Sequence, residues 1–146
     1  MVQHTGEMTT NKIWRVAVLG AKGRMGSEAV RAVNTAADMD LVAALGSADP
    51  LTKLLDVKAD VIIDLTVPTA TEANVRFAVE HGIHAVVGTT GWNEERLSSL
   101  KQLLGEHPGV GVLIAPNFAI GSILATEFAA KAARYFESAE IIEIQH

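Results

Sequence analysis

Three glycines, Gly20, Gly23 and Gly26, stand between an apolar run and a segment of helical periodicity. Because glycine has no side chain, a turn that contains several can bring its backbone N–H groups close to an anion. In this spacing Gly20 permits a tight turn, Gly23 admits a pyrophosphate, and Gly26 lets the helix lie close to the sheet. The N–H groups and the positive dipole end of the helix then stabilise the phosphates. The motif predicts a dinucleotide site, and the alternative is a tight turn that binds no ligand.

Small, hydroxyl and amide residues follow three further apolar runs. Each run is predicted to be a strand, and open α/β sheets bind ligands beyond the carboxyl ends of their strands. The segments concerned are "LTVP" (65–68), "GTTG" (88–91) and "APNF" (115–118). Their backbone and hydroxyl groups are predicted to reach a ribose or nicotinamide, and the candidates are Gly88, Thr89 and Thr90.

Asn117 and Phe118 each allow two interpretations. The Asn117 carboxamide can pair with an amide of a ligand, or it can cap the helix that follows. Phe118 can stack on a cofactor ring or pack in the core as a hydrophobic staple, and the pattern favours the core.

The end of the second predicted strand lacks an acid that would select a ribose 2′-hydroxyl. NAD-specific sites place such an acid about 20 residues beyond the glycines. Here the strand ends at residues 45–47, and the first acid after it is Asp49. Lys22 and Arg24 add positive charge to the glycine loop, although solvated loop charges are the alternative. We therefore predict that NADPH is accepted at least as well as NADH.

The composition limits the classes of partner. Of the 146 residues, 49% are hydrophobic and only 5% aromatic, which is typical of helices packed on a parallel sheet. The formal net charge of −5 disfavours nucleic acid and anionic membranes as partners. The absence of cysteine excludes a thiolate nucleophile, and the histidine spacing predicts no metal site. With no signal peptide or apolar span in the sequence, the expected location is the cytoplasm.

Short apolar runs alternate with segments of helical period, which indicates right-handed βαβ units. The predicted fold class is α/β, a doubly wound parallel Rossmann-type sheet with helices on both faces. One helix is expected to begin at a capping box formed by Thr69 and Glu72, and Asn93 is expected to cap the next. The predicted strands span residues 14–20, 39–46, 59–66, 84–90, 109–117 and 139–146, and a long helix is expected at 119–136.

Four motifs occur in a fixed order, "VAVLGAKGRMG", "VIIDLTVP", "HAVVGTTGW" and "VLIAPNFAIG". Together they resemble the N-terminal part of the 4-hydroxy-tetrahydrodipicolinate reductase family. The resemblance implies a tetrameric cytoplasmic enzyme of lysine and diaminopimelate biosynthesis that uses NADPH or NADH. Its substrate would be a cyclic, unsaturated dicarboxylate that accepts a hydride. The implied cofactor-binding residues, with Ser47 at the end of the second strand, are Gly20, Ala21, Lys22, Gly23, Arg24, Met25, Ser47, Gly88, Thr89, Thr90, Ala115, Pro116, Asn117 and Phe118.

The sequence departs from the family pattern at its catalytic position. When Glu143 is aligned with the family's glutamate, Gln145 occupies the place of the acid-base histidine. Glutamine cannot deliver a proton near neutral pH, so the catalytic residue is unknown. The implied substrate-binding residues are His146 and Thr90.

The family's lysine and Ser-Gly-Thr segment have no counterpart in the sequence. The chain is therefore expected to be a fragment that binds the cofactor with little or no turnover. It is divided into a flexible tail (1–12), a dinucleotide-binding domain (13–137) and the first strand of a truncated α+β substrate domain (138–146). This last strand is expected to present an unpaired apolar edge.

Two other functions fit a glycine turn of this kind. One is a nucleotide-sensing or CoA-binding module without catalysis. The other is a different two-domain dehydrogenase acting on aspartate-derived aldehydes, which would ordinarily lack "GTTG" followed by "APNFAIG".

Asp64 lies within an apolar strand. A buried carboxylate there needs a hydrogen-bond partner, and a structural hydrogen bond is favoured over a catalytic role.

Overall fold

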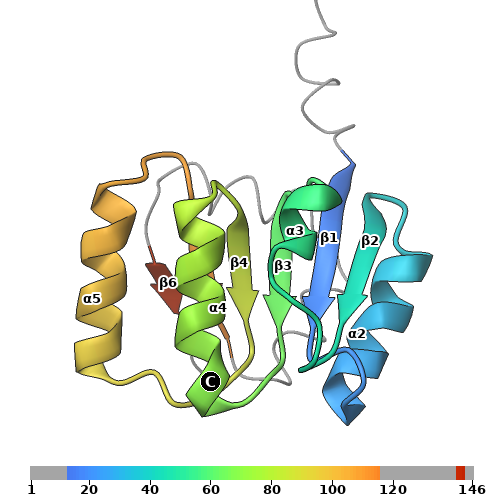
Figure 1. Cartoon of the computed structure of the whole chain (residues 1–146), viewed down its shortest axis with the longest axis horizontal. Helices are drawn as coiled ribbons and strands as arrows, with labels where there is room; N and C mark the ends of the chain where they lie inside the picture. The colour runs from blue at the N-terminus through green and yellow to red at the C-terminus, as the bar shows by residue number, and fades with distance from the viewer. Residues whose placement is uncertain (1–12, 116–140, 144–146) are drawn as a thin grey trace, which may run out of the picture.

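A computed structural model describes residues 13–115 and 141–143 (Figure 1). Within them, strands and helices alternate along the chain. The strands are β1 (Trp14–Leu19), β2 (Met39–Leu45), β3 (Val61–Asp64), β4 (His84–Val87), β5 (Val112–Ile114) and β6 (Ile141–Glu143). The helices are α2 (Arg24–Thr35), α3 (Lys53–Asp56), α4 (Pro68–Glu80) and α5 (Glu94–Gly105).

The described strands form one parallel sheet with the order β2-β1-β3-β4-β5-β6. The chain runs from β1 outward to β2 and then crosses back to place β3 on the other side of β1. The strand order therefore reverses between β1 and β3, where the connections leave the sheet in opposite directions and open a crevice. The predicted doubly wound α/β fold is confirmed.

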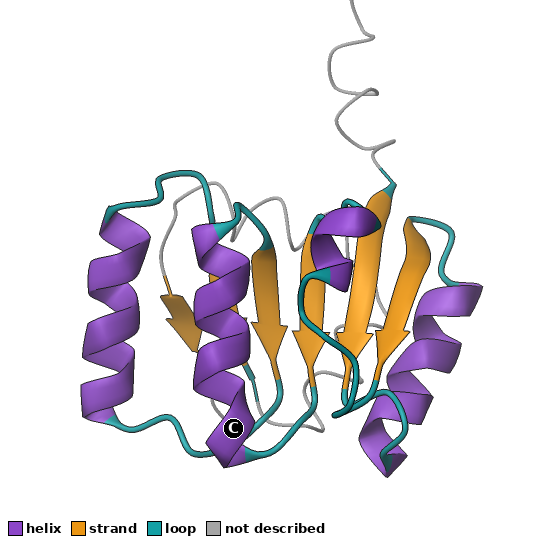
Figure 2. Ribbon diagram, viewed as in Figure 1, coloured by secondary structure: helices purple, strands orange, loops and turns teal. Residues whose placement is uncertain are grey.

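Helices cover both faces of the sheet, and each face has its own apolar core. On one face Ala29 and Val33 of α2 pack with the strand residues Val16 and Ile63. Figure 2 shows α3, α4 and α5 in front of the opposite face. The central strands are buried on both sides, which explains why their sequences are continuous apolar runs rather than alternating ones.

The predicted start of α4 was wrong. Val67 is the N-cap of this helix, Pro68 occupies its first turn, and no side chain caps it, so Thr69 and Glu72 form no capping box. Proline suits the first helical position because the N–H that it lacks would have had no partner within the helix. The cap predicted for α5 is confirmed, since Asn93 Oδ1 accepts a hydrogen bond of 2.8 Å from the Arg96 N–H. The single turn of α3 was not predicted, because it is too short to show periodicity.

The last described strand, Ile141–Glu143, pairs in parallel with Val112–Ile114 of β5 and so extends the same sheet. It is the outermost strand in the order of the described sheet, so only one of its two edges is paired there. Its assignment to a second domain stays a prediction. The domain limits at residues 137 and 138 stay predictions. The predicted tail and the predicted helix at 119–136 lie outside the described residues.

Lys58, between α3 and β3, has a φ of +54°, which lies in the left-handed region. This conformation costs a residue with a Cβ atom roughly 1 kcal/mol or more. We expect Lys58→Gly to raise the free energy of unfolding by about 0.5 kcal/mol, because relief of strain outweighs the added freedom of the unfolded chain. Urea denaturation measures this change. The same replacement at exposed Lys101 of α5 should lower the free energy by about 1 kcal/mol, and equal effects at both sites would contradict the interpretation.

Candidate functional site

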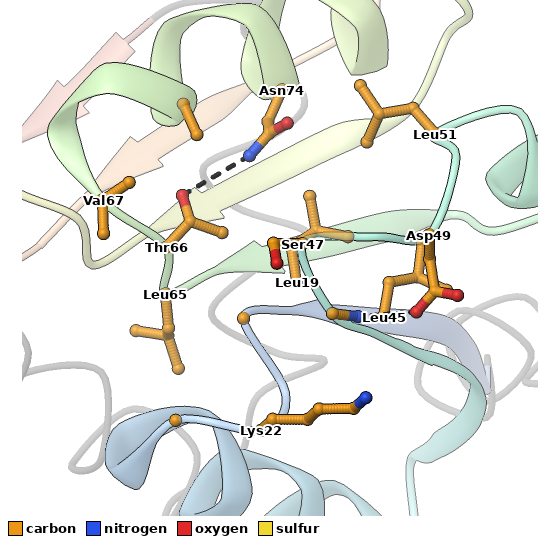
Figure 3. A pocket seen from close by; sticks show the side chains of 14 residues that line it. Leu19, Lys22, Leu45, Ser47, Asp49, Leu51, Leu65, Thr66, Val67 and Asn74 are labelled. Carbon is orange, nitrogen blue, oxygen red and sulfur yellow. Dashed lines mark hydrogen bonds between the residues drawn. The ribbon is translucent and has the colours of Figure 1, made fainter.

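A cavity of about 600 Å³ opens at the carboxyl ends of β1, β2 and β3 (Figure 3). Its walls come from the glycine loop after β1, the loop after β2, and the loop after β3 with the beginning of α4. The volume is within the range of roughly 300–1,000 Å³ that small-molecule sites occupy. The cavity lies at the switch point of the sheet, where the topology predicts a ligand.

A second cavity of about 270 Å³ lies beside the first. Arg24 and Met25 of α2 form one side of it, and the ends of β3 and β4 form the other through Thr66, Thr89 and Thr90. The two cavities share Gly23, Leu65 and Thr66. They therefore lie next to each other across the ends of β1, β3 and β4, with Gly23 between them.

The glycine loop is fixed by close contacts of its own backbone. Gly20 has a φ of +79°, and a Cβ atom there would overlap the carbonyl oxygen of Leu65. A Cβ atom at Gly26 would overlap the carbonyl oxygen of Gly20. At Gly23 the nearest atom to an added Cβ is the Gly20 oxygen at 3.5 Å, an ordinary contact. Packing within the protein thus requires Gly20 and Gly26, whereas Gly23 is needed only if something else occupies the space beside it.

The N-terminus of α2 faces this space without a cap. Its N-cap is Gly23, which makes no side-chain hydrogen bond, and its first turn contains no acidic residue. The first N–H groups of a helix have no partner within the helix and lie at the positive end of its dipole. Exposed Lys22 and Arg24 add two positive charges next to them. This arrangement suits an anion such as a diphosphate.

A cation, Lys22, and an anion, Asp49, both lie next to Gly46 after the end of β2. The alkyl chain of Lys22 lies along Gly46, since its Cδ and Cε are 3.4 Å from a Cβ built there. Asp49 turns back so that its Oδ2 accepts a hydrogen bond of 2.8 Å from the Gly46 N–H. Both side chains line the first cavity (Figure 3). From the sequence, Asp49 was predicted to lie too far beyond the strand to bind a ribose 2′-hydroxyl. The turn at Gly46 instead brings Asp49 to the cavity wall.

Asp64, the last residue of β3, is fully buried beneath the second cavity and accepts hydrogen bonds from three threonines. Its Oδ2 accepts a bond of 2.6 Å from the Thr71 hydroxyl of α4. Its Oδ1 accepts a bond of 2.6 Å from the Thr66 hydroxyl and one of 3.1 Å from the Thr66 N–H. The Thr89 hydroxyl lies 3.2 Å from Oδ1 and 3.0 Å from the Asp64 carbonyl oxygen. The structural hydrogen bond favoured from the sequence is confirmed.

Burial raises the pKa of Asp64 above its ordinary value of 3.8, while the hydrogen bonds from Thr66, Thr71 and Thr89 act in the opposite direction. The folded chain therefore binds this proton more tightly than the unfolded chain does. Such a group contributes stability below pH 3.8 that is lost as the pH rises through the folded-state pKa.

We therefore expect Asp64→Asn, which cannot ionise, to gain in stability relative to the unaltered chain as the pH rises from about 4 to about 7. Urea denaturation of both proteins at several pH values measures the difference in unfolding free energy. A difference that moves the opposite way would show that the hydrogen bonds outweigh burial in setting the pKa.

The structure brings most of the predicted cofactor-binding residues to the two cavities. Those that line a cavity are Gly20, Lys22, Gly23, Arg24, Met25, Ser47, Thr89 and Thr90. Ala21, Gly88 and Ala115 line neither, and each donates its N–H to a backbone carbonyl: Leu45, Asp64 and Val87 respectively. Pro116, Asn117, Phe118, Gln145 and His146 lie outside the described residues.

The side chain of Thr89 is held within the protein. It is 5% exposed and its hydroxyl donates to the Asp64 carbonyl oxygen, while its place among the cofactor-binding residues stays a prediction. Thr90, by contrast, is exposed. The alternation of side chains along an extended segment explains why neighbouring threonines differ in this way.

Other cavity residues were not predicted as site residues. Thr66 and Val67 lie in the segment 65–68, which the sequence placed at a strand end without naming them as site residues. Leu51 and Asn74 reach the first cavity from the β2–α3 connection and from α4. Asn74 Nδ2 lies 3.4 Å from the Thr66 hydroxyl oxygen (Figure 3), and no pattern in the sequence predicts this contact.

Metal sites and membrane spans are both lacking in residues 13–115 and 141–143. Among these residues no cluster of three or more histidine, aspartate or glutamate side chains has the arrangement of a metal site. None of the helices described there has the length and apolar character needed to cross a bilayer.

Residues 14–118, which include all the residues of both cavities, match a family model described as "Dihydrodipicolinate reductase, N-terminus". The chain belongs to this family. The N-terminal region of a dihydrodipicolinate reductase is a nucleotide-binding domain, and the glycine loop and both cavities fall within it. The family resemblance read from the four sequence motifs is thereby confirmed.

Individual relatives agree with the family match. The chain is 58% identical over 132 residues to the 4-hydroxy-tetrahydrodipicolinate reductase of Streptomyces griseus subsp. griseus, covering 90% of the chain and 53% of that protein. The enzyme of the same name from Streptomyces avermitilis is 59% identical over 132 residues, again covering 90% of the chain and 53% of that protein. Among solved structures, the chain resembles dipicolinate-bound dihydrodipicolinate reductase from Paenisporosarcina sp. TG-14, with a TM-score of 0.68 and 31% identity over 84% of the chain and 54% of that structure. The chain thus spans about half the length of the curated relatives it matches, which is 53% for both Streptomyces enzymes.

Proposed function

We propose that this chain binds NADPH or NADH across the two cavities and provides the cofactor domain of a 4-hydroxy-tetrahydrodipicolinate reductase. The observation that carries the proposal is the position of Gly23. It lies between both cavities at the uncapped N-terminus of α2, and its missing side chain leaves space that the protein's own packing does not need. A diphosphate would occupy this space and accept hydrogen bonds from the helix N–H groups.

The two cavities suit the two halves of a dinucleotide. The larger one has Lys22, Ser47 and Asp49 at the end of β2, where the ribose of the adenosine half would lie. The smaller one has Thr66, Thr89 and Thr90 at the ends of β3 and β4, on the side of the nicotinamide half. When bound, the cofactor supplies the hydride, and this chain's residues supply binding and orientation.

The activity of the whole protein follows from its family. We infer reduction of 4-hydroxy-tetrahydrodipicolinate to tetrahydrodipicolinate, in lysine and diaminopimelate biosynthesis, by a cytoplasmic homotetramer. The dipicolinate bound to the Paenisporosarcina reductase supports a small dicarboxylate as substrate. Substrate contacts by Thr90 and His146 stay proposals, as does the replacement of the acid-base histidine by Gln145. The 146-residue chain is expected to bind the cofactor with little or no turnover.

Titration of the chain with NADPH, followed by the fluorescence of the reduced nicotinamide, tests the proposal. Saturable binding with an affinity in the micromolar range is expected. A separate calorimetric titration with coenzyme A distinguishes the alternative of a CoA-binding module. Saturable binding of coenzyme A together with an absence of NADPH binding would favour that alternative and refute the reductase proposal.

Lys22 at the end of β2 supports the prediction that NADPH binds at least as tightly as NADH. Lys22 can pair with a 2′-phosphate, while Asp49 can accept a hydrogen bond from a 2′-hydroxyl. We expect Lys22→Met to weaken NADPH binding about tenfold and NADH binding less than about threefold, since only NADPH loses an ion pair. Dissociation constants for both cofactors check this. Lys101→Met, a charge change at an exposed position of α5, serves as the control. A strong preference of the unaltered chain for NADH would contradict the prediction.

A further inference from the structure

The carboxylate of Asp64 is not required by the packing of the sheet. In the parallel register its neighbours are Leu19 of β1 and Val87 of β4, and both are buried apolar residues. Asp64 itself is 0% exposed. A buried carboxylate costs several kcal/mol of desolvation that its partners must offset, whereas an apolar residue at this position would carry no such cost. The position therefore keeps a polar group for a reason other than core packing.

The two carboxylate oxygens serve different parts of the fold. Oδ2 bonds to Thr71, within the body of α4, and Thr71 lines neither cavity. Oδ1 bonds to Thr66, in the loop after β3, and lies within hydrogen-bond distance of Thr89, in the loop after β4. These loops also bond to each other, because the Thr66 N–H donates to the Thr89 hydroxyl over 2.9 Å. One buried oxygen thus joins two loops that are 23 residues apart in the sequence.

A second set of contacts joins the loop after β4 to the beginning of α4, directly after the loop that follows β3. Arg96 of α5 donates from Nη1 to the carbonyl oxygens of Pro68 at 2.8 Å and Gly91 at 3.5 Å. Its Nε lies 3.3 Å from the Glu72 carboxylate. Gly91 has a φ of +101°, and a Cβ atom there would lie 2.8 Å from the Cβ of Pro68, so the two loops are in direct contact. The wall of the second cavity is therefore built from two strand ends that are joined by contacts on both sides.

We propose that Asp64 is a positioning residue that fixes the loops after β3 and β4 as one wall, against which the nicotinamide half of the cofactor binds. The inference rests on the proposed function, since it assigns a role within that site. Asp64 does not contact the cofactor. It acts through Thr89, which lines the second cavity alone, and through Thr66, which lines both cavities. Lys22, Ser47 and Asp49, at the end of β2 where the adenosine half is proposed to lie, are outside this hydrogen-bond network.

The test compares the whole cofactor with its adenosine half. The probes are NADPH and adenosine 2′,5′-bisphosphate, and the measured quantity is the ratio of their dissociation constants for the 146-residue chain. Asp64→Ala removes both acceptor oxygens. We expect it to weaken NADPH binding about tenfold, as for the loss of one hydrogen bond to a charged group, and bisphosphate binding by less than about twofold.

Two matched variants separate positioning from stability. Asp64→Asn keeps one oxygen as acceptor for Thr66 and Thr89 and places its NH2 group toward Thr71. The ratio of the two dissociation constants should therefore stay within about threefold of its value in the unaltered chain. Thr71→Val removes the bond to α4 and should lower the free energy of unfolding while leaving the ratio unchanged. If Asp64→Ala weakens both probes equally, or if Thr71→Val shifts the ratio as far as Asp64→Ala does, Asp64 has only a structural role and the proposal is wrong.

Asp64→Leu fills the same space without acceptors and replaces Asp64→Ala if that variant does not fold. Amide hydrogen exchange of the unaltered chain gives a measurement that needs no variant: the Thr66 amide should be strongly protected, and rapid exchange there would overturn the proposal. Failure of the unaltered chain to bind either probe would refute the proposed function and the positioning role together. Binding of both probes with an unchanged ratio in the Asp64 variants would refute the positioning role alone.

Discussion

Gly26→Ala is expected to lower the free energy of unfolding by about 3 kcal/mol, the upper range for overpacking, although alanine is the better helix former by about 1 kcal/mol. A Cβ atom at Gly26 would overlap the carbonyl oxygen of Gly20 and lie 2.6 Å from its carbon and 2.9 Å from the Cα of Ala21. All three are backbone atoms, which cannot rotate away. The turn after β1 would have to move, and with it the wall of the first cavity.

Urea denaturation of the Gly26→Ala chain measures this loss. Gly105→Ala is the matched control, because it lies in the last turn of α5 with no atom within 4 Å of an added Cβ. We expect the control to be neutral or more stable by a few tenths of a kcal/mol. A Gly26→Ala chain as stable as the control would show that the close approach of α2 to the glycine loop is not needed.

Gly23→Val is expected to raise the dissociation constant of NADPH by roughly 100-fold, or about 2.7 kcal/mol, while the chain remains folded. The backbone at Gly23 has φ of −76° and ψ of 175°, an extended conformation that valine adopts readily. The added methyl groups would occupy the space between the two cavities, where the diphosphate is proposed to lie. The loss of a favourable N-cap residue should cost only about 1 kcal/mol of stability.

Fluorescence titration with NADPH measures the affinity of the Gly23 variants, and thermal unfolding followed by circular dichroism establishes that they are folded. Gly23→Ala should give a smaller loss than Gly23→Val, because a single methyl group leaves part of the space open. A folded Gly23→Val chain that binds NADPH as tightly as the unaltered chain would refute the placement of the diphosphate at the N-terminus of α2. The two glycines therefore separate the packing role of the motif from its binding role.

Local signals in the sequence were sufficient for the architecture and for the glycine loop. Continuous apolar runs identify strands buried on both faces, and helical periodicity identifies α2, α4 and α5, because both patterns depend on residues close together in the chain. The order of the four motifs was specific enough to indicate the family. Asn93 was correctly predicted as a cap, since a helix cap requires only a side chain that reaches the backbone three residues away.

Contacts between distant segments were decided only by the tertiary structure. Asp49 reaches the cavity because its loop turns back onto Gly46, and Asp64 finds Thr89, which is 25 residues further along, because β3 and β4 pair in register. The pairing of β6 with β5 likewise depends on the edge that the other strands leave open. Sequence periodicity determines which face of an element is buried, but register and loop direction determine which side chains meet. The sequence therefore determined the fold and the position of the proposed diphosphate site, while only the assembled sheet showed how the walls of that site are held together.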